Sequence, residues 1–119
     1  MNWYLAKIVF RIVCGAGDHT PQFDEQLRLI EAADEAAALS KASQMGRDGQ
    51  DCFVNNKEQM VHWKFVNVPE LYRMSALIDG AEVYSTITES DDADRYIENI
   101  NHRAAQLALK QTHKLLQIL

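Results

Sequence analysis

The chain has 119 residues, 47% of them hydrophobic and 24% charged, which is typical of a globular protein large enough to bury its own core. A net charge of -5 without a basic cluster argues against nonspecific binding to nucleic acid or to anionic membranes. No apolar run reaches a membrane span of roughly 20 residues, and Lys7 and Arg11 interrupt the first apolar stretch, unlike a signal peptide. We therefore expect one cytoplasmic domain over residues 1–119, with neither nucleic acid nor membrane as a partner.

Residues 3–14 read as a strand that is apolar on both faces. One alternating set, from Tyr4 to Cys14, is wholly apolar, so we expect it to face the core. The other set begins with Trp3 and carries two cations, Lys7 and Arg11, among large hydrophobic residues. The pattern predicts that this second face has a cover or a ligand.

The next elements are predicted to be a second strand and a short helix. A cluster of turn formers at residues 15–21 leads into alternating residues 23–29, which predicts a hairpin with the first strand. Asp34 is the predicted N-cap of an alanine-rich helix over residues 35–45, and Gly46 is its predicted stop. Small residues at helical spacing indicate that this helix packs closely.

Apolar and polar residues alternate again in the middle of the chain. Residues 52–54 predict a short strand, residues 55–57 a left-handed turn, and residues 60–68 a long strand that ends at Pro69. The apolar face of that strand is predicted to consist of Val61, Trp63 and Phe65.

The last third predicts a hairpin and a long helix. Residues 71–78 and 81–89 are expected to pair across the turn Asp79-Gly80. A helix from Ser90 nearly to Leu119 follows, with apolar residues at the 3.6 period. The fold class is therefore α+β: an antiparallel sheet of five to six strands packed on one face by a short helix and a long C-terminal helix, in the order β-β-α-β-β-β-β-α.

An ordered series of residues runs through roughly the first three-quarters of the chain. Its members are Trp3-Tyr4, Ala6, Phe23-Asp24-Glu25, Leu29, Ala36, Lys41, Ala42, Gly46, Phe53, Asn55, Val61-x-Trp63-x-Phe65, Asp79-Gly80 and Glu82-Val83. This series resembles the uncharacterised bacterial family called domain of unknown function 4288, and the helix from Ser90 onward has no counterpart in it. The resemblance implies a small α+β domain and supplies no activity.

The sequence contains no catalytic or cofactor motif of real specificity, which disfavours an enzyme without excluding one, and we expect no catalytic residue and no cofactor. The only cysteines, Cys14 and Cys52, lack the short spacing of a metal or redox motif. We expect two buried thiols in a reducing compartment and no metal.

The face of the sheet that carries the cations of the first strand is the candidate binding surface. Three interpretations remain open for it: a site for an anionic small molecule, a subunit interface, or an ordinary solvated face. The residues of the candidate ligand site are Lys7, Arg11, Arg28, His62, Lys64 and Tyr84.

We expect a homodimer or a module that binds another protein, through this sheet face, the apolar C-terminal turns, or both. The alternatives are a small-molecule binder or minor enzyme, and a small acidic protein that neutralises a basic toxin. The candidate interface residues are Trp3, Leu5, Val9, Leu115, Leu116, Ile118 and Leu119.

Overall fold

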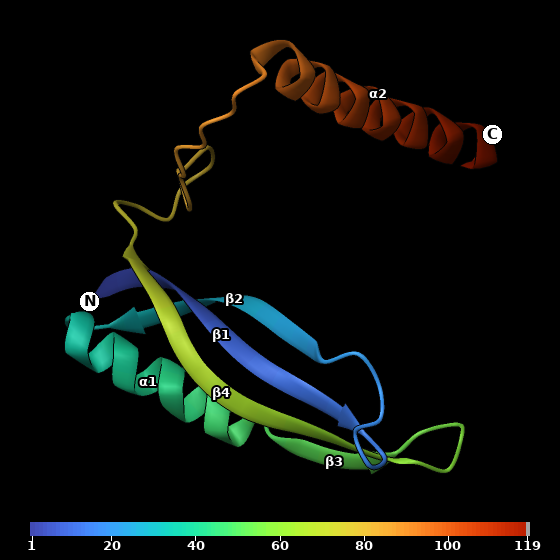
Figure 1. The fold of residues 1–119 in the computed structure, drawn as a ribbon. Helices are drawn as coiled ribbons and strands as arrows, with labels where there is room; N and C mark the ends of the chain where they lie inside the picture. The colour runs from blue at the N-terminus through green and yellow to red at the C-terminus, as the bar shows by residue number, and fades with distance from the viewer. Residues whose placement is uncertain (119) are drawn as a thin grey trace. The chain divides into compact units, whose positions relative to one another are not determined.

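The computed structural model describes the backbone of residues 1–118 and the side chains of residues 1–112 and 116. The chain divides into two compact units, Met1–Ser85 and Thr86–Leu119, and each is described by itself. Figure 1 shows the sheet and first helix of the first unit and the long helix of the second.

The first unit is a four-stranded antiparallel sheet crossed by one helix. Its elements are β1 (Asn2–Cys14), β2 (Gln22–Ala32), α1 (Glu35–Asp48), β3 (Asp51–Val54) and β4 (Met60–Arg73). The strand order is β2-β1-β4-β3, so β1 and β4 are central and β2 and β3 are the edges. The α+β class and the antiparallel sheet are confirmed, but the prediction of five to six strands is wrong.

The helix α1 lies across one face of this sheet and contacts β1, β2 and β4 (Figure 1). The wholly apolar set of β1 is on that face: Tyr4, Ala6 and Ile8 are at most 4% exposed. Ile30 of β2 and Ala42 of α1 pack into the same core. The predicted core face of the first strand is confirmed, as is its hairpin with the second.

The start of α1 is as predicted, whereas its end is not. The Asp34 carboxylate accepts a hydrogen bond from the backbone N–H of Ala37 at 2.8 Å, which caps the helix. The helix does not stop at Gly46 but continues to Asp48, and Gly49 is its cap. Gly46 is buried because the ring of Phe65 packs directly on it, at the place where a side chain would stand.

The strand β4 continues through Pro69 to Arg73, so the predicted end at Pro69 is wrong. The pairing register between β1 and β4 shifts around Val9, and Pro69 therefore has no direct partner in β1. On the other edge, β3 pairs only with residues 60–63 of β4. A proline is tolerated here because neither neighbouring strand needs its missing N–H.

The turns also depart from the prediction. Residues 55–57 do not adopt the left-handed conformation; among the non-glycine residues described, Glu58 does, with φ 61°. The side chain of Asn55 instead organises the turn by accepting hydrogen bonds from the backbone N–H groups of Lys57 and Gln59.

The predicted hairpin of residues 71–89 does not form. Residues 71–73 belong to β4, and residues 74–92 contain no strand. The turn itself is present: Gly80 has φ 81° and the N–H of Ala81 bonds the carbonyl of Ile78 at 3.0 Å. Its flanks form no continuous buried face: Met74 is 5% exposed, but Ile78 is 70% and Ile87 94% exposed. The element order is therefore β-β-α-β-β-α.

The second unit contains the predicted C-terminal helix, α2 (Ala93–Ile118). Asp92 caps it, because its carboxylate accepts the backbone N–H of Arg95 at 3.0 Å. All described side chains of α2 are exposed. Within the described part of the chain, neither helix combines the length and the apolar composition needed to cross a membrane.

Candidate functional site

The candidate site is the sheet face opposite α1, which we call the open face. On β1 it carries Trp3, Leu5, Lys7, Val9 and Arg11, because these alternate with the buried set. Leu5 is only 6% exposed, whereas Arg11 is exposed. The interface candidates Trp3, Leu5 and Val9 thus share one face, as predicted.

The edge strand β2 presents an apolar row on the open face. We call Phe23, Leu27 and Leu29 the apolar row; they lie opposite Arg11, Lys7 and Leu5 in the hairpin register. Their exposures are 57%, 52% and 47%, large for side chains of this kind. The alternation in the sequence predicts a strand here, but it does not say which set of side chains the helix covers, so the row could not be predicted as a surface.

The polar set of β2 lies on the other side of the sheet. Arg28 is paired with Ala6, which is fully buried beneath α1, so Arg28 belongs to the helix side and not to the open face. Its guanidinium donates to the side-chain oxygen of Gln26 at 2.8 Å. Placing Arg28 in the candidate ligand site was therefore wrong, because β2 turns its apolar set away from the helix.

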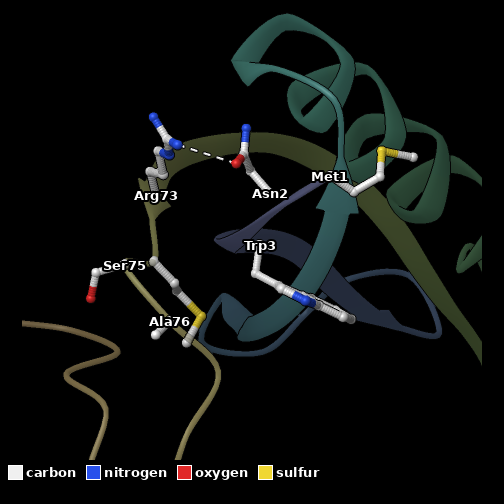
Figure 2. Close-up of a pocket in the computed structure, with 7 residues that line it drawn as sticks. Met1, Asn2, Trp3, Arg73, Ser75 and Ala76 are labelled. Carbon is white, nitrogen blue, oxygen red and sulfur yellow. Dashed lines mark hydrogen bonds between the residues drawn. The ribbon is translucent and has the colours of Figure 1, made fainter.

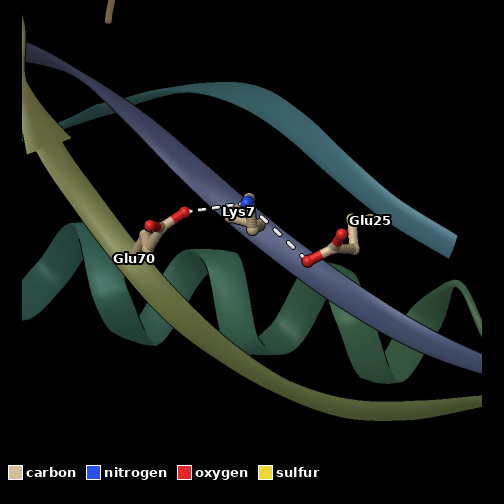
Figure 3. A network of polar contacts seen from close by, with 3 residues as sticks. All are labelled: Lys7, Glu25 and Glu70. Atoms are coloured by element: carbon tan, nitrogen blue, oxygen red, sulfur yellow. Dashed lines mark ion pairs between the residues drawn. The ribbon is translucent and has the colours of Figure 1, made fainter. Parts of the chain in front are cut away.

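Lys7 is engaged by two carboxylates on the open face (Figure 3). Its Nζ lies 3.0 Å from Oε2 of Glu70 on β4 and 3.7 Å from Oε1 of Glu25 on β2. The Glu70 oxygen is shielded from solvent, and the Lys7 ammonium compensates its charge. Lys7 is thus already paired within the protein, which makes it a poor anchor for an external anion.

The same contacts shift three pKa values. The hydrogen bond to Glu70, helped by Glu25 and opposed by desolvation, raises the pKa of Lys7 above its ordinary 10.5. Hydrogen bonds from Lys7 and Tyr72 lower the pKa of Glu70 below 4.5. The hydrogen bond with Glu70 and desolvation raise the pKa of Tyr72. All three shifts favour an ionised Lys7–Glu70 pair beside a neutral phenol.

We expect the Glu70 interaction to contribute to stability only above acidic pH. Its folded pKa is depressed, so the contribution is complete above the ordinary value of 4.5 and is lost as pH falls through the folded pKa. The Lys7 contribution is present below 10.5 and disappears only as pH rises through its higher folded pKa. Thermal unfolding of the wild type and Glu70→Gln should show the wild type more stable at neutral pH and the difference shrinking below about pH 4. A difference independent of pH would contradict this assignment.

The remaining predicted ligand residues fall into two groups. Lys64 lies opposite Arg11, and His62 lies opposite Val13. The polar side chains of Arg11, Lys64 and His62 therefore share one end of the open face. Tyr84 lies at the other end, where its ring meets Tyr72 edge-on at 5.4 Å. Lys7 and Arg11 are four residues apart on β1, about 13 Å along an extended strand. The structure therefore does not bring all the candidates around one small anion.

The two thiols differ from the prediction. Cys14 is half-buried and Cys52 is exposed, so the expectation of two buried cysteines is wrong. Cys52 is on the short edge strand β3 directly opposite His62, and hence on the open face. Sequence spacing could not identify this pair, because a sheet register joins residues ten positions apart.

A pocket of about 400 Å³ lies where the N-terminus meets the chain leaving β4 (Figure 2). Arg73 donates across it to Oδ1 of Asn2 at 3.1 Å. The residues lining it include no carboxylate, imidazole or thiol, so the pocket offers no acid–base pair. They are Met1, Asn2, Trp3, Arg73, Met74, Ser75 and Ala76.

Of the C-terminal interface candidates, Leu116 is 62% exposed. The side chains of Leu115 and Ile118, and residue Leu119, lie outside the part of the chain that the structure describes.

The fold and the open face define a small α+β domain with an antiparallel sheet covered by α1 on one face. Residues 3–85 match the family model described as Domain of unknown function (DUF4288), and the chain belongs to this family. The match ends where the first compact unit ends, which confirms the resemblance over the first three-quarters of the chain. No curated protein and no solved structure matches the chain.

Proposed function

We propose that this protein is a non-enzymatic binding module that forms a homodimer through the open face. The observation that carries the proposal is the exposure of the apolar row: Phe23, Leu27 and Leu29 face solvent beside the nearly buried Leu5. Contiguous exposed apolar side chains rimmed by polar groups mark interaction surfaces. The two free thiols suit a reducing compartment, so we propose a cytoplasmic location.

A second copy of the chain suits this surface. In a two-fold dimer the same patch serves both partners, so the apolar row of one copy would pack on that of the other. Lys7, Glu25 and Glu70 lie on the same face and would form a polar rim in which the Lys7 ammonium pairs with both carboxylates, leaving a net charge of one negative unit per copy.

The helix α2 offers a second self-complementary surface. Its large apolar side chains that the structure describes as exposed are 43–62% exposed, and its described charges are mainly acidic in the first half and basic in the second. That asymmetry complements the helix dipole, and it also pairs opposite charges when two copies of α2 lie antiparallel. The large apolar residues are Tyr96, Ile97, Ile100, Leu107, Leu109 and Leu116, the acidic ones Asp94 and Glu98, and the basic ones Arg103 and Lys110, with Arg95 as the basic exception in the first half.

Light scattering of the full chain after size exclusion tests the proposal. At tens of micromolar we expect a mass of twice the 13.6 kDa of the chain. Leu27→Glu should convert this dimer to a monomer, because it places two carboxylates in the apolar interface. The matched control is Leu39→Glu, which changes an equally large leucine, 44% exposed on α1, away from the open face.

The same experiment distinguishes an interface on α2 from one on the open face. Leu107→Glu acts on α2 alone, so a monomer produced by Leu107→Glu and not by Leu27→Glu would assign the dimer to the helix and overturn the role of the open face. A monomeric wild type would overturn the dimer altogether.

A second candidate function is the binding of an anionic small molecule, favoured by the end of the open face where Arg11 and Lys64 are cross-strand neighbours. Both are exposed, and among the described residues neither forms an ion pair like that of Lys7. Two adjacent cations without carboxylate partners suit a phosphate or carboxylate group.

A further inference from the structure

Two soft sulfur atoms and an imidazole nitrogen lie near one another at the β3 edge of the open face. Sγ of Cys52 lies 3.1 Å from Sδ of Met60 and 4.0 Å from Nε2 of His62. The Cys52 thiol thus lies close to both a thioether and an imidazole.

The sheet holds these donors in place. Cys52 is directly opposite His62 in the antiparallel register, and Met60 precedes His62 by two residues, so all three side chains project from the same face. The β3–β4 hairpin is closed by Asn55, whose side chain bonds two backbone N–H groups of the connecting turn. The site therefore rests on a hydrogen-bonded scaffold and not on a loop.

We propose that Cys52, Met60 and His62 form a binding site for a single copper(I) ion. Thiolate and thioether sulfur select Cu(I), and imidazole is an accepted ligand of copper. With the zinc distances as a guide, about 2.3 Å to sulfur and about 2.0 Å to imidazole nitrogen, two sulfur donors lie about 3.8–4.0 Å apart and a sulfur–nitrogen pair about 3.5–3.7 Å apart in tetrahedral or trigonal geometry. The two sulfur atoms therefore need to separate by less than about 1 Å, and Sγ of Cys52 and Nε2 of His62 need to approach by about 0.5 Å or less.

The composition of the site favours a soft monovalent ion over a divalent one. No group of three or more His, Cys, Asp or Glu residues within the described residues could hold a metal, so the thioether of Met60 is what completes the set. Lys64 and Arg11 are the next polar side chains along the same face, and their charges disfavour a divalent ion, whose complex with one thiolate keeps a net charge of +1. Cu(I) with a thiolate is neutral, and the thiol proton is released to solvent on binding.

Accessibility permits loading of the site. Cys52 is exposed, Met60 is 44% exposed and His62 is half-buried. The apolar row lies on β2, at the opposite edge of the sheet, with β1 and β4 between. The copper site therefore lies on the open face but outside the apolar row that would make the dimer contact.

Anaerobic competition between the full chain and the chromophoric Cu(I) chelator bicinchoninate tests the proposal. We expect the wild type to withdraw one equivalent of Cu(I), and X-ray absorption to show two sulfur ligands and one nitrogen ligand. Cys52→Ser should abolish uptake, and Met60→Leu should lower the affinity by at least about tenfold, a loss that even outer-shell changes produce at metal sites. Both side chains are exposed, so neither change should affect folding, which circular dichroism can verify.

The other cysteine provides the matched control. Cys14→Ser should retain full uptake, because Cys14 is not part of the site. Equal losses in Cys14→Ser and Cys52→Ser, or an unchanged affinity in Met60→Leu, would show that copper binds a thiol without the proposed site and would overturn the proposal. Light scattering of Cys52→Ser should still give the dimer, so the two proposals fail separately.

Discussion

Replacing Gly46 by alanine is expected to destabilise the domain by about 2 kcal/mol, although alanine is the better helix former. A Cβ atom at this position would overlap the ring of Phe65. The higher helix propensity of alanine returns about 1 kcal/mol, whereas overpacking a closed core typically costs 1–3 kcal/mol and occasionally more. The overlap dominates because Phe65 cannot easily move: its ring meets Phe10 edge-on at 6.2 Å.

Urea unfolding of the full chain measures this loss. The matched control is Ser40→Ala, an exposed position of the same helix, which should be neutral or slightly stabilising. In the double variant Gly46→Ala, Phe65→Leu the two changes should compensate in part, because the smaller side chain makes room for the methyl group. If Gly46→Ala were as stable as the wild type, the packing of the Phe65 ring would not require a glycine at position 46.

Hydrophobic alternation predicted the first strand and its core face. In β1 the alternating side chains from Tyr4 to Cys14 are all apolar, so only one orientation of the strand turns all of them toward the core. Ile8 and Phe10 of this set are accordingly 1% and 2% exposed. The N-cap of α1 was equally predictable, because Asp34 directly precedes an alanine-rich run and its carboxylate needs only the local backbone.

Long-range packing explains where the prediction was wrong. Gly46 is a stop signal in the sequence, but in the structure its missing side chain admits Phe65 from β4, nineteen residues further along the chain. Pro69 predicts the end of a strand, yet the register shift between β1 and β4 leaves it opposite no residue of β1, so its missing N–H breaks no hydrogen bond to β1. The turn at Gly80 forms without a hairpin, because a turn specifies a local bend and not the partners of its flanks.

The candidate site was predictable as a face but not as a set of contacts. Strand periodicity placed Lys7 and Arg11 together, whereas the carboxylate that neutralises Lys7 comes from Glu70, whose pairing depends on the register of β4. Arg28 was misplaced because β2 exposes its apolar set, which reverses the usual alternation of an edge strand. Cys52 and His62 became neighbours only through cross-strand pairing.

The two faces of the sheet should differ in what they contribute to stability, and Ile8→Ala should show the largest loss. Ile8 is 1% exposed in the core beneath α1, and truncation of a buried isoleucine to alanine typically costs about 2–5 kcal/mol. We expect the upper half of this range because Ile8 is one of the two largest fully buried side chains, and its neighbours are held by strand pairing on both sides.

The matched control is Val66→Ala on β4, a β-branched residue of the same sheet that is 52% exposed. The free energy of unfolding should fall by only about 0.5 kcal/mol, since folding buries little of the apolar surface of this side chain. Chemical unfolding at two protein concentrations distinguishes the core from the dimer contact. The free energy of unfolding lost in Ile8→Ala should be the same at both concentrations, because Ile8 packs within one chain. A dimer held by the apolar row should instead make the total free energy of unfolding rise with protein concentration. Equal losses in Ile8→Ala and Val66→Ala would contradict the assignment of the core to the α1 side of the sheet.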